Sequence, residues 1–277
     1  MRVDQLAINS ITTRQASLEE AIRAYAGAGF TQVEFHLPLL KAWLAAGNSV
    51  DAARDLLQAH GLRLIGGFEA GLECFSDAER MQANLELQIA NMRLIDALAG
   101  DSGGTLVVGT DGPATPSLEA LPVVAARLRE LADATAGLNV AIALEFNWGP
   151  LVKSVASARR VCELADRERV GILFDPAHYH CTVSKFEDLT PETVGWIAHV
   201  HLNDMEDKPG ELSDCNADRV LPGQGCLDLA ALIGRLDEGG YAGSYSIELF
   251  NEELWQQPAA EAASRCYQSL LPYCNGR

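Results

Sequence analysis

Short apolar runs recur along the chain, and amphipathic segments separate most of them. A short apolar run bounded by turn residues is typical of a buried strand, whereas apolar residues three or four positions apart are typical of a helix with one buried face. The predicted strands cover residues 6–8, 31–35, 62–65, 105–108, 140–145, 171–175, 197–201 and 246–248. The predicted helices cover residues 17–29, 50–60, 77–98, 117–134, 154–165, 228–238 and 258–270.

The alternation of strands with helices predicts a parallel sheet with helices on its outer face. About eight strand–helix units in 277 residues predict a single α/β domain over residues 1–277, a (β/α)8 TIM barrel. An open doubly wound sheet is the alternative, but no G-x-G-x-x-G motif follows the first strand. The longest irregular connection, 203–221, would lie at the carboxyl-terminal face of the barrel, where it can wall an active site.

Four of the predicted strands end in a side chain that can bind a metal: Glu145, Asp175, His201 and Glu248. A buried run tolerates such a charge only if it is paired or coordinated. The spacings of 30 residues from Glu145 to Asp175 and 26 from Asp175 to His201 each match about one strand–helix unit. Neighbouring strands lie about 5 Å apart, so these side chains can reach one ion. We therefore predict one divalent metal ion at this site.

Three carboxylates and one imidazole suit Mn, Mg, Co or Zn, and the ligand types do not choose among these metals. The alternative interpretation gives each residue a separate structural role. The two glutamates would pair with arginines, the aspartate would stand in a turn before Pro176, and the histidine would pack in the core. A shared site is favoured because the four residues occupy the same end of successive strands, where barrel enzymes carry their catalytic groups.

Composition narrows the range of partners. A net charge of −17 opposes binding to nucleic acid or to an anionic membrane. The seven cysteines form no CxxC pair, which favours free thiols in a reducing compartment. No apolar run reaches the roughly 18 residues of a membrane span, and the N-terminus lacks an apolar signal core. We expect a cytoplasmic protein with a small-molecule substrate; a homo-oligomer is compatible with the sequence.

Five motifs in the second half of the chain resemble those of a known family. They are IALEF (142–146), LFDPAHYH (173–180), HLNDMED (201–207), DRVLPGQG (218–225) and SIELF (246–250). In type and order they resemble the sugar phosphate isomerase/epimerase family with a xylose isomerase-like TIM barrel, and within it the inosose isomerases. The resemblance covers about residues 140–250. It implies that Glu145, Asp175, His201 and Glu248 are metal ligands, in agreement with their places at strand ends.

The resemblance also implies substrate contacts. His178, three residues after Asp175, matches a family histidine near the substrate, and Arg219 matches an arginine that contacts substrate oxygens. Trp148 is a third candidate for substrate binding.

Four further residues lie near predicted strand ends, and no motif supports the first two of them. Glu34 and His36 end the second strand and are expected to point at the barrel rim, and His180 is a further candidate near the site. His199 shares the inward face of its strand with His201, and core packing in a lower layer is favoured for it.

The mechanism implied by these residues is proton transfer beside a carbonyl. A metal that binds the ketone oxygen of a keto-inositol or ketose acidifies the neighbouring C–H and stabilises the enediolate. Glu145 or Glu248 then removes the proton, and a second group returns one. We expect an uncharged polyol or keto-sugar, because no arginine cluster or convincing glycine-rich loop for a phosphate occurs late in the barrel.

Three alternative functions stay open at this point. A lyase of the same family, such as an inosose or 3-dehydroshikimate dehydratase, would use the same ligands and then expel a β-hydroxyl. An endonuclease IV-type nuclease shares the barrel, but it uses three metals, and the acidic charge opposes DNA. A binding or sensory protein without turnover is disfavoured by an intact set of four ligands.

Overall fold

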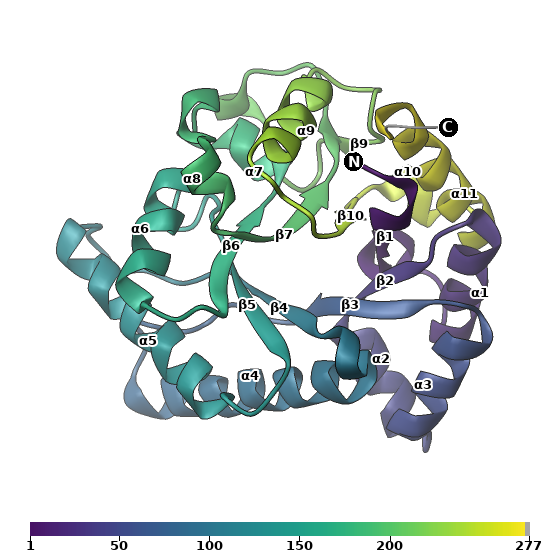
Figure 1. Cartoon of the computed structure of the whole chain (residues 1–277), viewed down its shortest axis with the longest axis horizontal. Coiled ribbons are helices and arrows are strands. Elements are labelled where there is room, and N and C mark those ends of the chain that lie inside the picture. The colour runs from purple at the N-terminus through teal and green to yellow at the C-terminus, as the bar shows by residue number, and fades with distance from the viewer. Residues whose placement is uncertain (275–277) are drawn as a thin grey trace.

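The computed structural model describes residues 1–274 and contains a closed barrel of eight parallel strands. The ring runs in the order β1-β10-β7-β6-β5-β4-β3-β2, so the first and last barrel strands pair and close it (Figure 1). The predicted TIM barrel is thereby confirmed. The barrel strands are β1 (Leu6–Asn9), β2 (Gln32–His36), β3 (Arg63–Phe68), β4 (Gly104–Val108), β5 (Val140–Glu145), β6 (Val170–Phe174), β7 (Ile197–Leu202) and β10 (Tyr245–Ile247).

Helices surround the strand ring on its outer side (Figure 1). The seven predicted helices are present, and Ser17 and Glu20 form a capping box at the start of the first one. Short helices that the pattern did not predict follow β2, β6 and β10. The helices are α1 (Leu18–Ala28), α2 (Leu37–Ala45), α3 (Val50–Ala59), α4 (Ala78–Ala99), α5 (Leu121–Ala134), α6 (Val155–Ala165), α7 (Pro176–Cys181), α8 (Pro191–Val194), α9 (Leu229–Glu238), α10 (Glu252–Trp255) and α11 (Ala259–Leu270).

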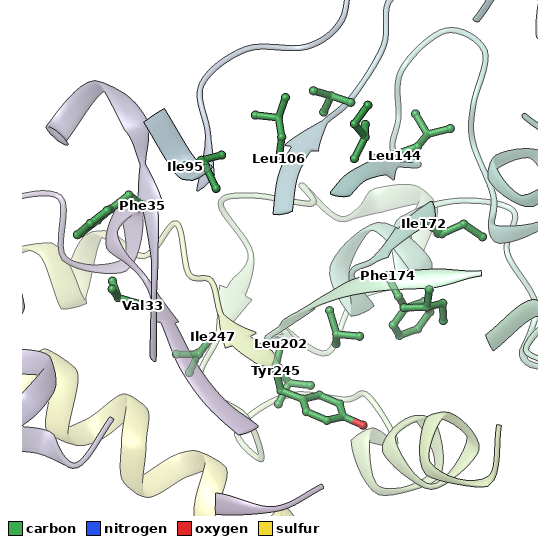
Figure 2. Packing of buried hydrophobic residues seen from close by; sticks show 14 of the residues in the cluster. Val33, Phe35, Ile95, Leu106, Leu144, Ile172, Phe174, Leu202, Tyr245 and Ile247 are labelled. Atoms are coloured by element: carbon green, nitrogen blue, oxygen red, sulfur yellow. The ribbon is translucent and has the colours of Figure 1, made fainter. Parts of the chain in front are cut away.

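Apolar side chains on the outer face of the strands form the main core with the helices. Figure 2 shows Val33, Leu144, Phe174, Leu202 and Ile247 arranged around the outside of the ring, and all are at most 1% exposed. Burial of each such side chain contributes roughly 1.5–3 kcal/mol. Successive side chains on a strand point to opposite faces, so the polar residue beside each of these points into the barrel. Core packing therefore fixes which residues face the site.

The interior of the barrel has an apolar half and a polar half. Val107, Ala143 and Leu173, on β4, β5 and β6, form a small separate apolar cluster. The strands on the other side of the ring, β1, β2, β7 and β10, carry buried polar residues instead: Asn9, Glu34, His199, His201 and Ser246.

The long connection after β7 folds back over the barrel mouth. It contains a small antiparallel pair, β8 (Asp204–Met205) and β9 (Arg219–Val220). The buried Asp204 carboxylate accepts backbone N–H groups from Gly223 and Gly225, each at 3.0 Å. A Cβ at Gly225 would collide with the Met205 carbonyl, so this close approach requires glycine. The connection thus walls the carboxyl-terminal face, as predicted, and returns Arg219 to it.

Candidate metal and substrate site

The four residues predicted as metal ligands stand at the carboxyl ends of β5, β6, β7 and β10. Ligand atoms of Asp175, His201 and Glu248 all lie within 4.8 Å of one another. Glu145 belongs to an overlapping group, in which its ligand atom lies within the same limit of Asp175 and His178. Asp175 therefore joins the two groups and places all four residues at one mouth of the barrel.

Hydrogen bonds hold two of the carboxylates, Asp175 and Glu248, in place. Asp175 caps α7: its Oδ1 accepts the backbone N–H of Ala177 at 2.8 Å and the side-chain amide of Asn203 at 3.0 Å. Glu248 accepts the side-chain amide of the buried Asn9 at 3.1 Å. The two carboxylates are thus oriented by groups outside the predicted ligand set.

The imidazole of His201 presents its Nδ1 to this cluster. Nδ1 lies 3.0 Å from Glu248 Oε2 and 3.6 Å from Asp175 Oδ2. Within the described chain, His201 Nδ1 and Asp175 Oδ2 are buried and make no hydrogen bond of good geometry. Each still has a charged neighbour at 3.0 Å: Glu248 Oε2 for His201 Nδ1, and Arg219 Nη2 for Asp175 Oδ2. Both atoms face the same cluster and could serve as ligands to a cation.

Arg219 supplies positive charge to the same cluster. It is 1% exposed, and its Nη2 and Nη1 lie 3.0 Å from Asp175 Oδ2 and 2.7 Å from Glu248 Oε2. Its Nε donates to the Cys215 carbonyl at 2.7 Å. The nearby carboxylates outweigh the effect of burial and raise the pKa of Arg219, which is charged at any working pH. Part of the alternative interpretation thus holds, since Glu248 does pair with an arginine, but that arginine belongs to the site.

His178 pairs with Glu145. Its Nε2 lies 3.3 Å from Glu145 Oε1 and 3.4 Å from Arg219 Nη2. Burial would lower the pKa of His178, but the charges of Glu145 and Asp175 raise it to about 10. Burial would raise the pKa of Glu145, yet the charge of His178 outweighs this and the pKa falls below its usual value. At neutral pH, Glu145 is therefore an anion.

The pKa values of Asp175 and His201 also depend on two opposing effects, burial and nearby charge. Burial would raise the pKa of Asp175, but Arg219 and His178 hold it well below its usual value. Burial would lower the pKa of His201, but Glu248 and Glu34 raise it well above the usual value. The site therefore concentrates negative charge, and this charge favours the protonated form of His201.

A cavity of about 280 Å³ opens over these side chains. His178, Arg219 and Trp148, the residues predicted to bind substrate, all line it. The Trp148 side chain is 49% exposed at the cavity. A second hollow of about 390 Å³ shares Phe68, Val107, Glu145 and Asn147 with the first and extends it along β3 and β4.

The other histidines lie apart from the cavity. His180 Nε2 contacts the Lys208 carbonyl at 2.9 Å and so links α7 to the long connection. His36 is half-buried and stacks on Phe68, with ring centres 4.9 Å apart. His199 is buried one layer below His201, as expected.

Glu34 differs from the expectation that it points at the rim. It is fully buried inside the barrel and accepts hydrogen bonds from His199 and His201. Asn9, which orients Glu248, was not predicted at all. Both stand in the first half of the chain, where no motif marks them; the available signal was a charge in the middle of the apolar run V-E-F and an amide directly after L-A-I.

The donor set fits a divalent metal. Glu145, Asp175, His201 and Glu248 offer three carboxylates and one ring nitrogen, which is typical of Mn²⁺, Co²⁺, Zn²⁺ or Mg²⁺ sites. Asp175, His201 and Glu248 are buried and bring their ligand atoms within 4.8 Å of one another, which agrees with this fit.

The chain belongs to the xylose isomerase-like TIM barrel family, whose model matches residues 22–270. Inosose isomerase of Bacillus subtilis (strain 168) is 38% identical over 138 residues, which are 49% of this chain and 49% of that enzyme. The match thus spans about half the length of that relative. The 3-dehydroshikimate dehydratase of Pseudomonas aeruginosa is 29% identical over 271 residues, which are 92% of this chain and 39% of that enzyme.

Solved structures share the fold along nearly all of the chain. The crystal structure of the IOLI protein with a bound zinc atom has a TM-score of 0.86 and 25% sequence identity, and the match covers 97% of each chain. The relatives named above, from Bacillus subtilis and Pseudomonas aeruginosa, are enzymes. Over residues 1–274, no helix is both long and apolar enough to span a bilayer.

Proposed function

We propose that this chain is a divalent-metal-dependent isomerase or epimerase of an uncharged keto-inositol or ketose. Glu145, Asp175, His201 and Glu248 would hold the metal, and His178, Arg219 and Trp148 would contact the substrate. The observation that carries the proposal is the convergence of ligand atoms of Asp175, His201 and Glu248, all three buried, within 4.8 Å of one another.

The metal, when bound, polarises a substrate carbonyl and acidifies the adjacent C–H. Glu145 is the better placed of the two glutamates to accept that proton. It is ionised at neutral pH and lines both hollows, and His178 contacts its Oε1. Glu248 is restrained by Asn9 and Arg219, so it is suited to keep a fixed orientation. The protonated His178 beside Glu145 can return a proton to the enediolate.

Arg219 would also stabilise negative charge on the substrate. Its guanidinium lies between Asp175 and Glu248 and also contacts His178, so it stands where negative charge develops on substrate oxygens. A fixed cation in a buried site stabilises such charge without reorganisation. Arg219 Nε donates to the Cys215 carbonyl and Nη1 to the Glu248 carbonyl, which keeps the guanidinium in place. The Asn251 side-chain amide donates to the backbone carbonyl of Arg219.

The lining of the two hollows supports an uncharged substrate. The cationic groups of the first hollow, His178 and Arg219, are already engaged with carboxylates. In the second hollow, Glu69 pairs with Lys41, and Thr110 and Asn147 offer hydroxyl and amide groups. Carboxylate and amide oxygens accept hydrogen bonds from hydroxyl groups, whereas a phosphate needs cationic or backbone N–H donors.

A dehydratase is the second candidate, because the 3-dehydroshikimate dehydratase relative matches 92% of this chain. It would begin with the same proton removal and then expel a β-hydroxyl group. The two reactions differ in product: a dehydratase forms a conjugated enone, which absorbs in the ultraviolet, and an isomerase or epimerase does not.

Proton exchange in heavy water tests the proposal. Metal-loaded protein is incubated in D₂O with a panel of keto-inositols and ketoses, and exchange is followed by proton NMR. We expect deuterium at the carbon beside the carbonyl of at least one compound, without enone absorbance. The Asp175→Asn variant and chelator-treated protein serve as controls and should show no exchange. Absence of exchange with every compound would reject the proposal, and enone absorbance would favour the dehydratase.

A further inference from the structure

A buried carboxylate stands behind the imidazole of His201, on the side away from the cavity. Glu34 Oε1 and Oε2 each lie 3.1 Å from His201 Nε2, and Oε2 also lies 3.1 Å from His199 Nε2. Glu34 is 0% exposed, and the two histidines are 2% exposed or less. The proposed mechanism does not use these contacts, although burial of an ionised carboxylate costs free energy.

The network crosses the barrel. Glu34 is on β2 and the histidines are on β7, and β1 and β10 separate these strands in the ring. Pairing within the sheet therefore does not bring the three residues together; their side chains meet in the barrel interior. The rings of His199 and His201 pack edge to face, with centres 5.4 Å apart. The arrangement locks the orientation of the His201 ring from behind.

Hydrogen bonding at one ring nitrogen determines the role of the other. A neutral imidazole carries one N–H, and an ionised carboxylate only accepts hydrogen bonds. When a metal replaces the Nδ1 proton, the imidazole is neutral, and donation from His201 Nε2 to Glu34 leaves the Nδ1 lone pair for the metal, beside Asp175 and Glu248. A carboxylate that accepts the second N–H of a metal-binding histidine also raises the basicity of the ligand nitrogen.

His199 holds the carboxylate itself. Its Nε2 is the second hydrogen-bond donor to Glu34 Oε2 and lies on the amino-terminal side of His201 along β7. His199 also lines a cavity of about 360 Å³ at the opposite end of the barrel, together with the first residues of β4 and β5. With donors from two histidines, the Glu34 carboxylate has one restrained position.

We propose that Glu34 is a positioning residue for the metal site: it fixes the ring and the tautomer of His201, and His199 fixes Glu34. This inference rests on the proposed function, since it assigns Glu34 a role only if His201 binds a metal. Glu34 itself contacts neither the metal nor the substrate.

The test measures metal affinity and histidine tautomer. Titration of metal-free protein with Co²⁺ or Zn²⁺, by calorimetry and by competition with a chelator, compares wild type with Glu34→Gln. The amide keeps the shape of the side chain, but its NH₂ group can donate to His201 Nε2 and favour the wrong tautomer. We expect a Kd about 10–100-fold higher, the range seen when such supporting partners are removed. Nitrogen-15 NMR of histidine-labelled, Zn²⁺-loaded wild type should show His201 protonated at Nε2.

Two further variants make the result specific. Ser246→Ala is the matched control, because Ser246 is the register partner of His201 on the neighbouring strand and its buried hydroxyl makes no hydrogen bond within residues 1–274; its metal affinity should equal that of wild type. His199→Gln removes the second imidazole and should raise Kd by about threefold to tenfold, the value of a typical hydrogen bond. This variant keeps the test valid if Glu34→Gln fails to fold.

The outcomes separate the two proposals. If wild type binds neither metal, the proposed function fails. If wild type binds metal and folded Glu34→Gln binds it equally tightly, only the positioning role is overturned. A His201 protonated at Nδ1 in the metal-loaded protein, or two metal ions per chain, would also overturn it.

Discussion

The two halves of the barrel interior differ in chemistry although both are built from parallel strands of one ring. On the β4–β6 side, Val107, Ala143 and Leu173 fill the interior with apolar atoms. On the β1, β2, β7 and β10 side, the interior holds Asn9, Glu34, His199, His201 and Ser246, all buried. Barrel interiors are usually packed with branched apolar residues, so the polar half is the exception.

The difference shows which part of the interior serves the site. Packing alone explains the apolar half, because each buried side chain there gains free energy from leaving water. The polar half gains little in this way, and its charged members are stable only through mutual hydrogen bonds. Its residues connect directly to the mouth of the barrel, where Asn9 supports Glu248 and Glu34 supports His201.

The largest expected effect is at the mouth, where the two halves meet. Glu145→Gln keeps the shape of the side chain but removes the proposed base, so turnover should fall about 10²–10⁴-fold. The fold should be preserved, as measured by circular dichroism. Glu163→Gln, which changes a glutamate on α6 that lines neither hollow, is the control and should keep wild-type turnover. Unchanged turnover of Glu145→Gln would exclude Glu145 as base and as ligand.

A change in the apolar half should affect stability instead of metal binding. Leu173→Ala leaves a cavity in the apolar cluster and should lower the free energy of unfolding by about 2–5 kcal/mol. Denaturant unfolding of the metal-free protein measures this loss. The Kd for Co²⁺ should stay close to that of wild type. A loss of affinity as large as that expected for Glu34→Gln would show that the two halves are not separate in function.

The smallest effect is expected at Ser246, a polar position whose hydroxyl makes no hydrogen bond to the site within residues 1–274. Ser246→Ala removes a fully buried hydroxyl that makes no hydrogen bond within residues 1–274. Its free energy of unfolding should be unchanged or higher by up to about 1 kcal/mol, because an unpaired buried polar group is costly. Thermal and denaturant unfolding measure this. A clear loss of stability would indicate that Ser246 has a partner in solution and belongs to the network.

The sequence predicted the barrel and the end of it that carries the site. The pattern of apolar and polar residues located all eight strands. The predicted boundaries differ from the observed ones by a few residues at most. The short helices after β2, β6 and β10 were missed because four to nine residues hold too few turns to show a period. Glu145, Asp175, His201 and Glu248 were visible because each interrupts or follows an apolar run at the same end of a strand.

By itself, the sequence determined the order of strands and helices, the face of each strand that is buried, and four charged side chains at a common edge. These follow from local hydrophobic pattern, which each segment carries on its own. Only the tertiary structure decided that Arg219 lies among the carboxylates, that Asn9 supports Glu248, and that Glu34 stands behind His201. Such contacts join strands far apart in sequence, and closure of the ring, not any local pattern, brings them together.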